Sequence, residues 1–164
     1  MAELTLRPPQ LLVSRRAIWY WTLRAAAAWA LLLILQAVVW INDPSGSARV
    51  HEAILGATAV AAVVHLVVMP NWRYRVHRWE RTADAVYTQA GWFNVERRIA
   101  PISRIQTVDS QMGPLERLFQ LANVTVTTAS AAGPLKIHGL DRATAQALVD
   151  DLIRTTQATP GDAT

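Results

Sequence analysis

Two long apolar runs lie in the first 70 residues of this 164-residue chain and constrain its fold more than any other feature. They cover 25–41 and 53–69, are 17 residues long, and contain no Asp, Glu, Lys or Arg. A helix rises about 1.5 Å per residue, so each run spans about 25 Å, close to a hydrocarbon core of about 30 Å. The runs predict transmembrane helices over 17–41 and 53–70, joined by an external loop over 42–52.

The arginines around these runs predict how the hairpin is oriented. Four precede the first run (Arg7, Arg15, Arg16, Arg24), four follow the second (Arg73, Arg75, Arg78, Arg81), and the loop has only Arg49. Basic residues close to the membrane ends favour the cytoplasm. We therefore expect both termini to be cytoplasmic, with a cytoplasmic segment over 1–16 and an external turn at Asp43–Gly46. A cleaved signal peptide is the alternative, but its apolar region would be about 7–15 residues, shorter than this first run.

Small residues within the runs predict how the two helices pack. They recur every four residues, at Ala26 and Ala30 in the first run and at Ala53, Ala57 and Ala61 in the second. Small residues at this spacing let helix backbones approach in lipid, although alanine is also simply abundant here. In an antiparallel hairpin Gln36 and Thr58 fall at similar depth, which makes an interhelical hydrogen bond plausible.

His65 is the one titratable residue well inside an apolar run. Ionisable groups at such positions are candidates for function, including proton relay or metal binding. However, the sequence places no carboxylate at the same depth. A neutral imidazole that is hydrogen-bonded across the hairpin, or that lies near the inner headgroups, is the favoured interpretation.

Residues 71–156 change to alternating apolar and polar positions, which indicates antiparallel strands. We expect strands over 72–81, 85–90, 95–99, 123–128 and 135–138, apolar anchors within 101–109, and a short helix over 114–120. A longer helix over 141–156 is expected to start at a capping Asp141 and to bury one apolar stripe. The stripe consists of Ala145, Leu148, Val149, Leu152 and Ile153. Residues 157–164 are expected to be a disordered tail.

Composition excludes several classes of function. The chain has no cysteine, so disulfides, thiolate catalysis and cysteine-based zinc sites are excluded. The candidate catalytic residues are His77, Asp109, Ser110, Glu116 and His138, but they form no motif, and both histidines are expected on outward faces. We expect no enzyme, metal or cofactor. Of the 16 basic residues, eight flank the membrane runs, so the net charge of +4 does not predict nucleic-acid binding.

Four stretches of the chain resemble a known family. They are IAPISRIQTV at 99–108, GPLERLF at 113–119, ANVTVTT at 122–128 and IHGL at 137–140. In order and spacing they resemble the YdbS-type bacterial membrane proteins with a PH-like domain, and they cover most of 72–156. The resemblance implies an α+β fold, in which a transmembrane helical hairpin precedes a bent antiparallel β-barrel of about seven strands with a C-terminal capping helix. One departure is Gln120, because the family usually carries a glycine after the short helix.

The resemblance also implies a bacterial cell-membrane location, an envelope-related role and little about mechanism. Members are often paired with a larger membrane protein that carries further PH-like domains. The sequence therefore favours a membrane-anchored, non-catalytic scaffold that binds such a protein or further copies of itself. In the alternative function, Arg73, Arg75, Arg78 and Arg81 bind anionic lipid headgroups at the inner leaflet. A purely topological role for these four arginines, keeping the hairpin inside-positive, is the simpler explanation.

Overall fold

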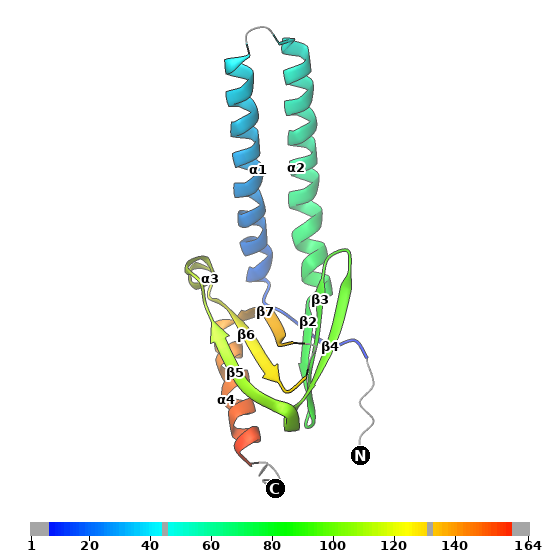
Figure 1. Cartoon of the computed structure of the whole chain (residues 1–164), viewed down its shortest axis with the longest axis vertical. Coiled ribbons are helices and arrows are strands. Elements are labelled where there is room, and N and C mark those ends of the chain that lie inside the picture. The colour runs from blue at the N-terminus through cyan, green and yellow to red at the C-terminus, as the bar shows by residue number, and fades with distance from the viewer. Residues whose placement is uncertain (1–6, 44–45, 131–132, 159–164) are drawn as a thin grey trace.

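The computed structural model describes residues 7–43, 46–130 and 133–158 and shows two long antiparallel helices rising from a small domain (Figure 1). Along the chain the elements are β1 (Leu11–Leu12), α1 (Arg16–Asn42), α2 (Ala48–Val76), β2 (Arg78–Arg81), β3 (Ala85–Gly91), β4 (Val95–Pro101), η1 (Ile102–Arg104), β5 (Ile105–Gln111), α3 (Pro114–Leu118), β6 (Leu121–Thr128), β7 (Leu135–Asp141) and α4 (Arg142–Ala158). The centre of the predicted Asp43–Gly46 turn, at 44–45, and the end of the predicted tail, at 159–164, lie outside the described residues. Gln157, at the start of that predicted tail, is the penultimate residue of α4.

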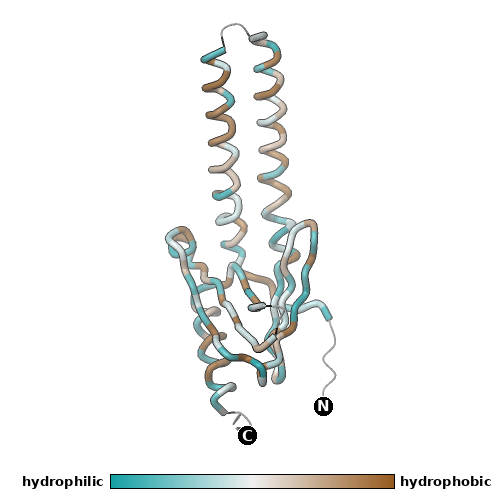
Figure 2. The backbone as a smooth tube through the Cα atoms, viewed as in Figure 1, coloured by the Kyte–Doolittle hydropathy of each residue, from teal (hydrophilic) through white to brown (hydrophobic). Residues whose placement is uncertain are grey.

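The helical hairpin is long and apolar enough to cross a membrane. Helix α1 has 27 residues and α2 has 29, and both are dominated by hydrophobic residues along their upper lengths (Figure 2). Most of the large apolar side chains in this region are exposed, among them Val39, Val60 and Val67. Exposed apolar surface of this extent is expected for helices that face lipid.

The face of α2 that contacts α1 differs from the predicted alanine stripe. Ala53, Ala57 and Ala61 are exposed, and on α1 Ala30 is exposed whereas Ala26 is half-buried. The shielded positions of α2 alternate in steps of three and four residues: Leu55, Thr58, Ala62, His65 and Met69. A strict four-residue repeat drifts by about 40° per step around a helix of about 3.6 residues per turn, so it leaves the contact seam. The predicted packing role of the alanines on α2 is therefore wrong.

Two hydrogen bonds between side chains cross the hairpin. The amide Nε2 of Gln36 donates to Oγ1 of Thr58 at 2.9 Å. The indole Nε1 of Trp29 donates to Nδ1 of His65, also at 2.9 Å. Because Nδ1 is the acceptor, the imidazole in this arrangement is neutral with its proton on Nε2. These bonds satisfy polar groups that lipid could not solvate.

The expected strand over 72–81 is wrong in its first half. Helix α2 continues through Pro70 to Val76, and only Arg78–Arg81 forms a strand. The prediction treated Pro70 as a helix end and the alternation of Tyr74 and Val76 as a strand pattern. In the structure Pro70 and Val76 are buried, and the backbone N–H of His77 donates to the carbonyl of Arg73 at 2.9 Å. Tertiary packing thus extends the helix into the domain.

The domain consists of two antiparallel sheets with strand orders β1-β2-β3-β4 and β5-β6-β7. Val86 pairs with Ala100 in the first sheet, and Val126 pairs with both Val108 and Leu135 in the second. Inward side chains of both sheets and of α4 form one core. Of the predicted stripe on α4, Ala145, Leu148, Val149 and Leu152 are buried but Ile153 is exposed. Asp141 accepts a hydrogen bond from the N–H of Ala143, as expected for a cap.

Helix α1 contributes to the core of the domain. Ala17, Tyr20 and Trp21 of α1, and Val13 just before it, are buried in the same cluster as the strand residues. Gly139 of β7 adopts a φ of +76°, and a Cβ there would lie 3.0 Å from Cβ of Ala17. The backbone N–H of Ser14 donates to the carbonyl of Gly139 at 2.9 Å. The first membrane helix and the domain are therefore parts of one folded body rather than an anchor and a tethered module.

Gln120, the departure from the family pattern, follows α3 with a φ of +55°. This left-handed conformation is one that glycine adopts freely and other residues adopt at a cost. The family's glycine at this position therefore has a conformational reason. Gln120 keeps the turn, and its carbonyl accepts a hydrogen bond from the N–H of Arg142 at 3.0 Å.

Candidate membrane-proximal site

A crevice of about 220 Å³ lies where the helical hairpin meets the domain. Helix α1 contributes three side chains to it and α2 contributes one, while α3, β6 and β7 close the other side. The main lining residues are Tyr20, Trp21, Arg24, Arg73, Glu116, Asn123 and His138. The site therefore exists only because α1 packs into the domain.

Two guanidinium groups, those of Arg24 and Arg73, line the crevice. Arg73 lies over the ring of Trp21, with its central carbon 4.6 Å from the ring centroid. Arg24 donates to the hydroxyl of Tyr20 at 3.0 Å. Within the described part of the chain neither arginine forms an ion pair. Two unneutralised cations at the base of a membrane hairpin form a site suited to an anion.

Glu116, the carboxylate in the crevice, is occupied by structural hydrogen bonds. Its Oε1 accepts from the hydroxyl of Tyr20 at 2.8 Å and from the amide of Asn123 at 3.2 Å. Burial raises the pKa of Glu116, but hydrogen bonds from Tyr20, its own backbone, Asn123 and Gly113 outweigh burial and lower the pKa overall. Asn123 lies at an irregularity in the β6–β7 pairing, which turns its side chain toward the crevice. Glu116 thus joins α1, α3 and β6.

The sequence predicts both histidines of the domain on outward faces, and this prediction is wrong for His77. His77 is 3% exposed, and its ring packs against Trp21 with centroids 5.1 Å apart. Burial, together with the charge of Arg73, lowers the pKa of His77 from 6.5 to about 4. His138 is half-buried, and burial, Arg73 and Lys136 lower its pKa as well. The burial of His77 against Trp21, and the approach of Arg73 to His138, join segments that are distant in the sequence, so the sequence alone could not predict them.

The four arginines proposed from the sequence do not converge. Arg73 lies in the crevice, whereas Arg75 is exposed and Arg78 donates to the carbonyl of Arg75 at 3.3 Å. Arg81 forms an ion pair with Asp151 of α4 at 2.7 Å and donates to the hydroxyl of Thr155. Arg24 takes the place beside Arg73 instead. The sequence feature that could have pointed to Arg24 as a site residue was its position immediately before the first apolar run.

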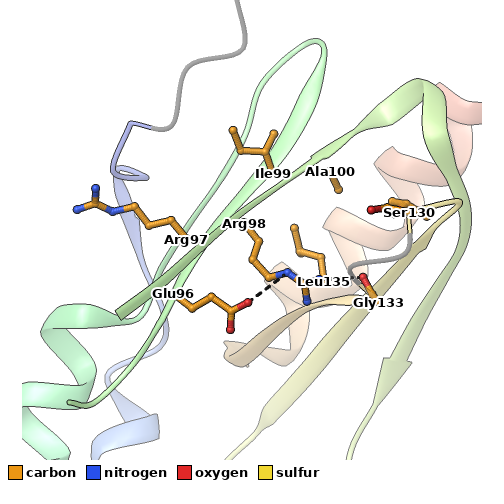
Figure 3. A pocket seen from close by; sticks show the side chains of 9 residues that line it. Glu96, Arg97, Arg98, Ile99, Ala100, Ser130, Gly133 and Leu135 are labelled. Carbon is orange, nitrogen blue, oxygen red and sulfur yellow. Dashed lines mark hydrogen bonds and ion pairs between the residues drawn. The ribbon is translucent and has the colours of Figure 1, made fainter. Parts of the chain in front are cut away.

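A second concave region separates the two sheets along β4 and β7 (Figure 3). This groove has a volume of about 350 Å³, and Arg98 spans it by donating to the carbonyls of Pro134 and Gly133 at 2.7 and 3.0 Å. Arg97 of the groove is exposed, and so is Lys136 of β7, which lines an adjoining hollow. In the described chain β4 pairs only with β3, so its other edge is free.

No arrangement for metal binding is present among the described residues, since no three His, Asp or Glu side chains cluster. Asp109 and Ser110 are exposed on β5, and Glu116 is engaged as described above. Two surfaces of the described residues are suited to binding: a cationic crevice beside the hairpin and a basic groove along the unpaired edge of β4.

These features define a class of protein: a bent two-sheet domain with a capping helix, built onto a membrane-spanning hairpin. The Bacterial PH domain family model matches residues 17–156, a range that includes both long helices. The UPF0699 transmembrane protein YdbS of Bacillus subtilis (strain 168) is 32% identical over 112 residues, which are 68% of this chain and 69% of that protein. The chain belongs to the bacterial PH domain family, and its fold is PH-like. No solved structure matches it.

Proposed function

We propose that the protein is a non-catalytic scaffold, which holds a partner at the cytoplasmic face of the bacterial membrane through its PH-like domain. The observation that carries this proposal is the free edge of β4 beside the basic groove. A free strand edge offers backbone N–H and C=O groups for strand addition, and neighbouring side chains supply specificity. Both termini are cytoplasmic in this proposal, because eight arginines flank the membrane runs.

The charges around β4 favour a particular kind of partner segment. Arg97 and Arg98 line the groove together with one acidic residue, Glu96, and Lys136 lines an adjoining hollow that shares Glu96 and Arg98 with it. Charged edge strands resist indiscriminate pairing, so an extended segment with acidic side chains is the favoured occupant. Such a segment would come from a second copy of this chain or from a larger membrane protein with PH-like domains. Because α1 is part of the domain core, the partner would be held in a fixed orientation to the membrane.

A charge reversal in β4 tests the scaffold. Arg97→Glu should reduce the amount of complex that is trapped by cross-linking in cells, measured as the larger species on a gel after extraction in mild detergent. Arg154→Glu is the matched control, since Arg154 is exposed on α4 and does not line the groove. A native chain that runs as a monomer without a partner, or equal behaviour of the two variants, would contradict the proposal.

A second candidate function is binding of an anionic lipid headgroup in the crevice. It is favoured by one observation, the unneutralised pair Arg24 and Arg73 at the base of the hairpin. Anionic lipid attracts each basic residue near the surface by about 1 kcal/mol. The test needs the full chain, because a domain without α1 would lack Ala17, Tyr20 and Trp21 of its core.

Lipid discs provide a direct assay of the crevice. The native chain should enrich phosphatidylglycerol over phosphatidylcholine in the lipid that copurifies with it, and Arg24→Gln with Arg73→Gln should remove the enrichment. Arg75→Gln is the control, because Arg75 is exposed on the same helix and does not line the crevice. Loss of enrichment in the control alone, or no enrichment in the native chain, would rule out specific binding here.

A further inference from the structure

The turn between β3 and β4, residues 91–94, points in the same direction as the two long helices and stands beside the lower part of α2 (Figure 1). We propose that this turn inserts Trp92 and Phe93 into the membrane leaflet on the domain's side. The partner that these two side chains contact is the lipid bilayer. The inference is independent of the scaffold role and of which face of the membrane carries the domain.

The depth of the turn follows from its contact with α2. The ring of Trp92 packs against His65 in a T-shaped arrangement, with centroids 5.7 Å apart. His65 lies four residues before Met69, the end of the second apolar run. At about 1.5 Å per residue, His65 is about 6 Å inside that end. If α2 spans the bilayer, a side chain packed against His65 lies at the level of the hydrocarbon boundary.

The side chains at the turn suit that depth. Phe93 is 83% exposed in the structure and packs on Trp92, with ring centroids 4.0 Å apart. Val95, the first residue of β4, is also exposed. Tryptophan is enriched where membrane meets water, and an exposed Trp–Phe pair in water would be costly. Continuity with the membrane-spanning helix identifies lipid as the partner that covers this pair.

The backbone of the turn is also adapted to a membrane environment. Polar backbone groups at membrane depth need internal partners, because lipid offers none. The carbonyl of Trp92 accepts a hydrogen bond from the indole Nε1 of Trp72 at 3.1 Å. Gly91 makes the tight turn with a φ of +134°, and a Cβ there would collide with the carbonyl oxygen of Asn94. Helix α2 therefore both positions the turn and satisfies its carbonyl.

The inserted turn would give the domain an attachment to the membrane beyond the two helices. On the other side of the hairpin α3 carries exposed Leu118 and is joined to Tyr20 of α1 through Glu116. Tyr20 precedes the first apolar run by five residues, about 7 Å, so α3 lies at the headgroup level. The deep turn and the shallow α3 flank the hairpin and would fix the tilt of the domain.

Site-directed spin labelling in liposomes tests the insertion, and the absence of native cysteine makes each label unique. Phe93→Cys is labelled in the full chain, and collisions with oxygen are compared with collisions with a water-soluble nickel chelate. Val64→Cys is the membrane reference, since it is lipid-exposed and adjacent to His65. Arg154→Cys on α4 is the aqueous reference.

The two outcomes are distinct. Insertion predicts that the label at Phe93→Cys collides preferentially with oxygen, as at Val64→Cys, and that the preference reverses at Arg154→Cys. A label at Phe93→Cys that collides preferentially with the nickel chelate, while Val64→Cys keeps its preference for oxygen, would overturn the proposal. Circular dichroism of each labelled chain confirms that the comparison is made on folded protein.

Discussion

Removing the indole of Trp21 should destabilise the entire PH-like domain, although Trp21 belongs to a membrane helix. Trp21 is 4% exposed, packs on the buried ring of His77 and supports the guanidinium of Arg73. Truncation of a buried aromatic residue to alanine costs about 3–5 kcal/mol. A factor of ten corresponds to about 1.4 kcal/mol, so the opening equilibrium of the domain should rise about a hundredfold to a few thousandfold.

A buried cysteine reports this opening. Val126 of β6 is fully buried, and Val126→Cys adds the only thiol in the chain. The rate at which a thiol reagent labels a buried position follows the open population when reclosing is fast. In the Val126→Cys background, Trp21→Ala should therefore accelerate labelling by the factor given above.

Trp19→Ala is the matched control for Trp21→Ala. Trp19 lies on the same helix but is 69% exposed, so its removal should change labelling by less than about threefold. If Trp21→Ala and Trp19→Ala label equally slowly, α1 is a tether and not part of the domain core. That result would show that the domain folds without support from Trp21.

Three further predictions use the same labelling assay. Because burial and the charge of Arg73 lower the pKa of His77 to about 4, its neutral form is favoured in the fold. Stability present above pH 6.5 should therefore fall by up to about 3 kcal/mol between pH 6.5 and 4, less so in His77→Gln, when each labelling rate is divided by that of the unfolded chain at the same pH; a flat profile would contradict this. Gln120→Gly should slow labelling by up to about fivefold. The strain of the left-handed backbone that glycine relieves exceeds the entropy that glycine costs by up to about 1 kcal/mol, and faster labelling would show that the turn is not strained. Gly139→Ala should destabilise the domain by about 1–3 kcal/mol, because of the positive φ at this position and the close approach of Ala17. An unchanged labelling rate would argue against that approach.

The sequence predicts the parts of this fold that depend on local pattern. The two apolar runs, the strands at 85–90, 95–99, 123–128 and 135–138, and the capping helix all appear at or close to their expected positions. Their periodicity is a property of neighbouring residues, and burial of one face then follows. The resemblance carried by four stretches within 99–140 adds the PH-like arrangement of these elements.

The candidate site could not be predicted because it joins distant segments. Trp21, Arg73 and His138 line one crevice only because α1 packs on β7, and no local pattern shows that contact. The strand Leu11–Leu12 has only two residues and forms by pairing with β2, so periodicity does not reveal it. The alternation at Tyr74 and Val76 was misleading. The end of α2 is enclosed by the domain, so both residues are shielded although they lie on nearly opposite sides of the helix.

The hairpin and the PH-like domain form one body. A distance measurement between two spin labels tests it most directly, with Leu31→Cys in the middle of α1 and Ala147→Cys on the exposed face of α4. In liposomes the account predicts a single narrow distance distribution, because α1 shares its core with the strands and α4. A broad distribution, as from a domain that moves on a flexible tether, would contradict it.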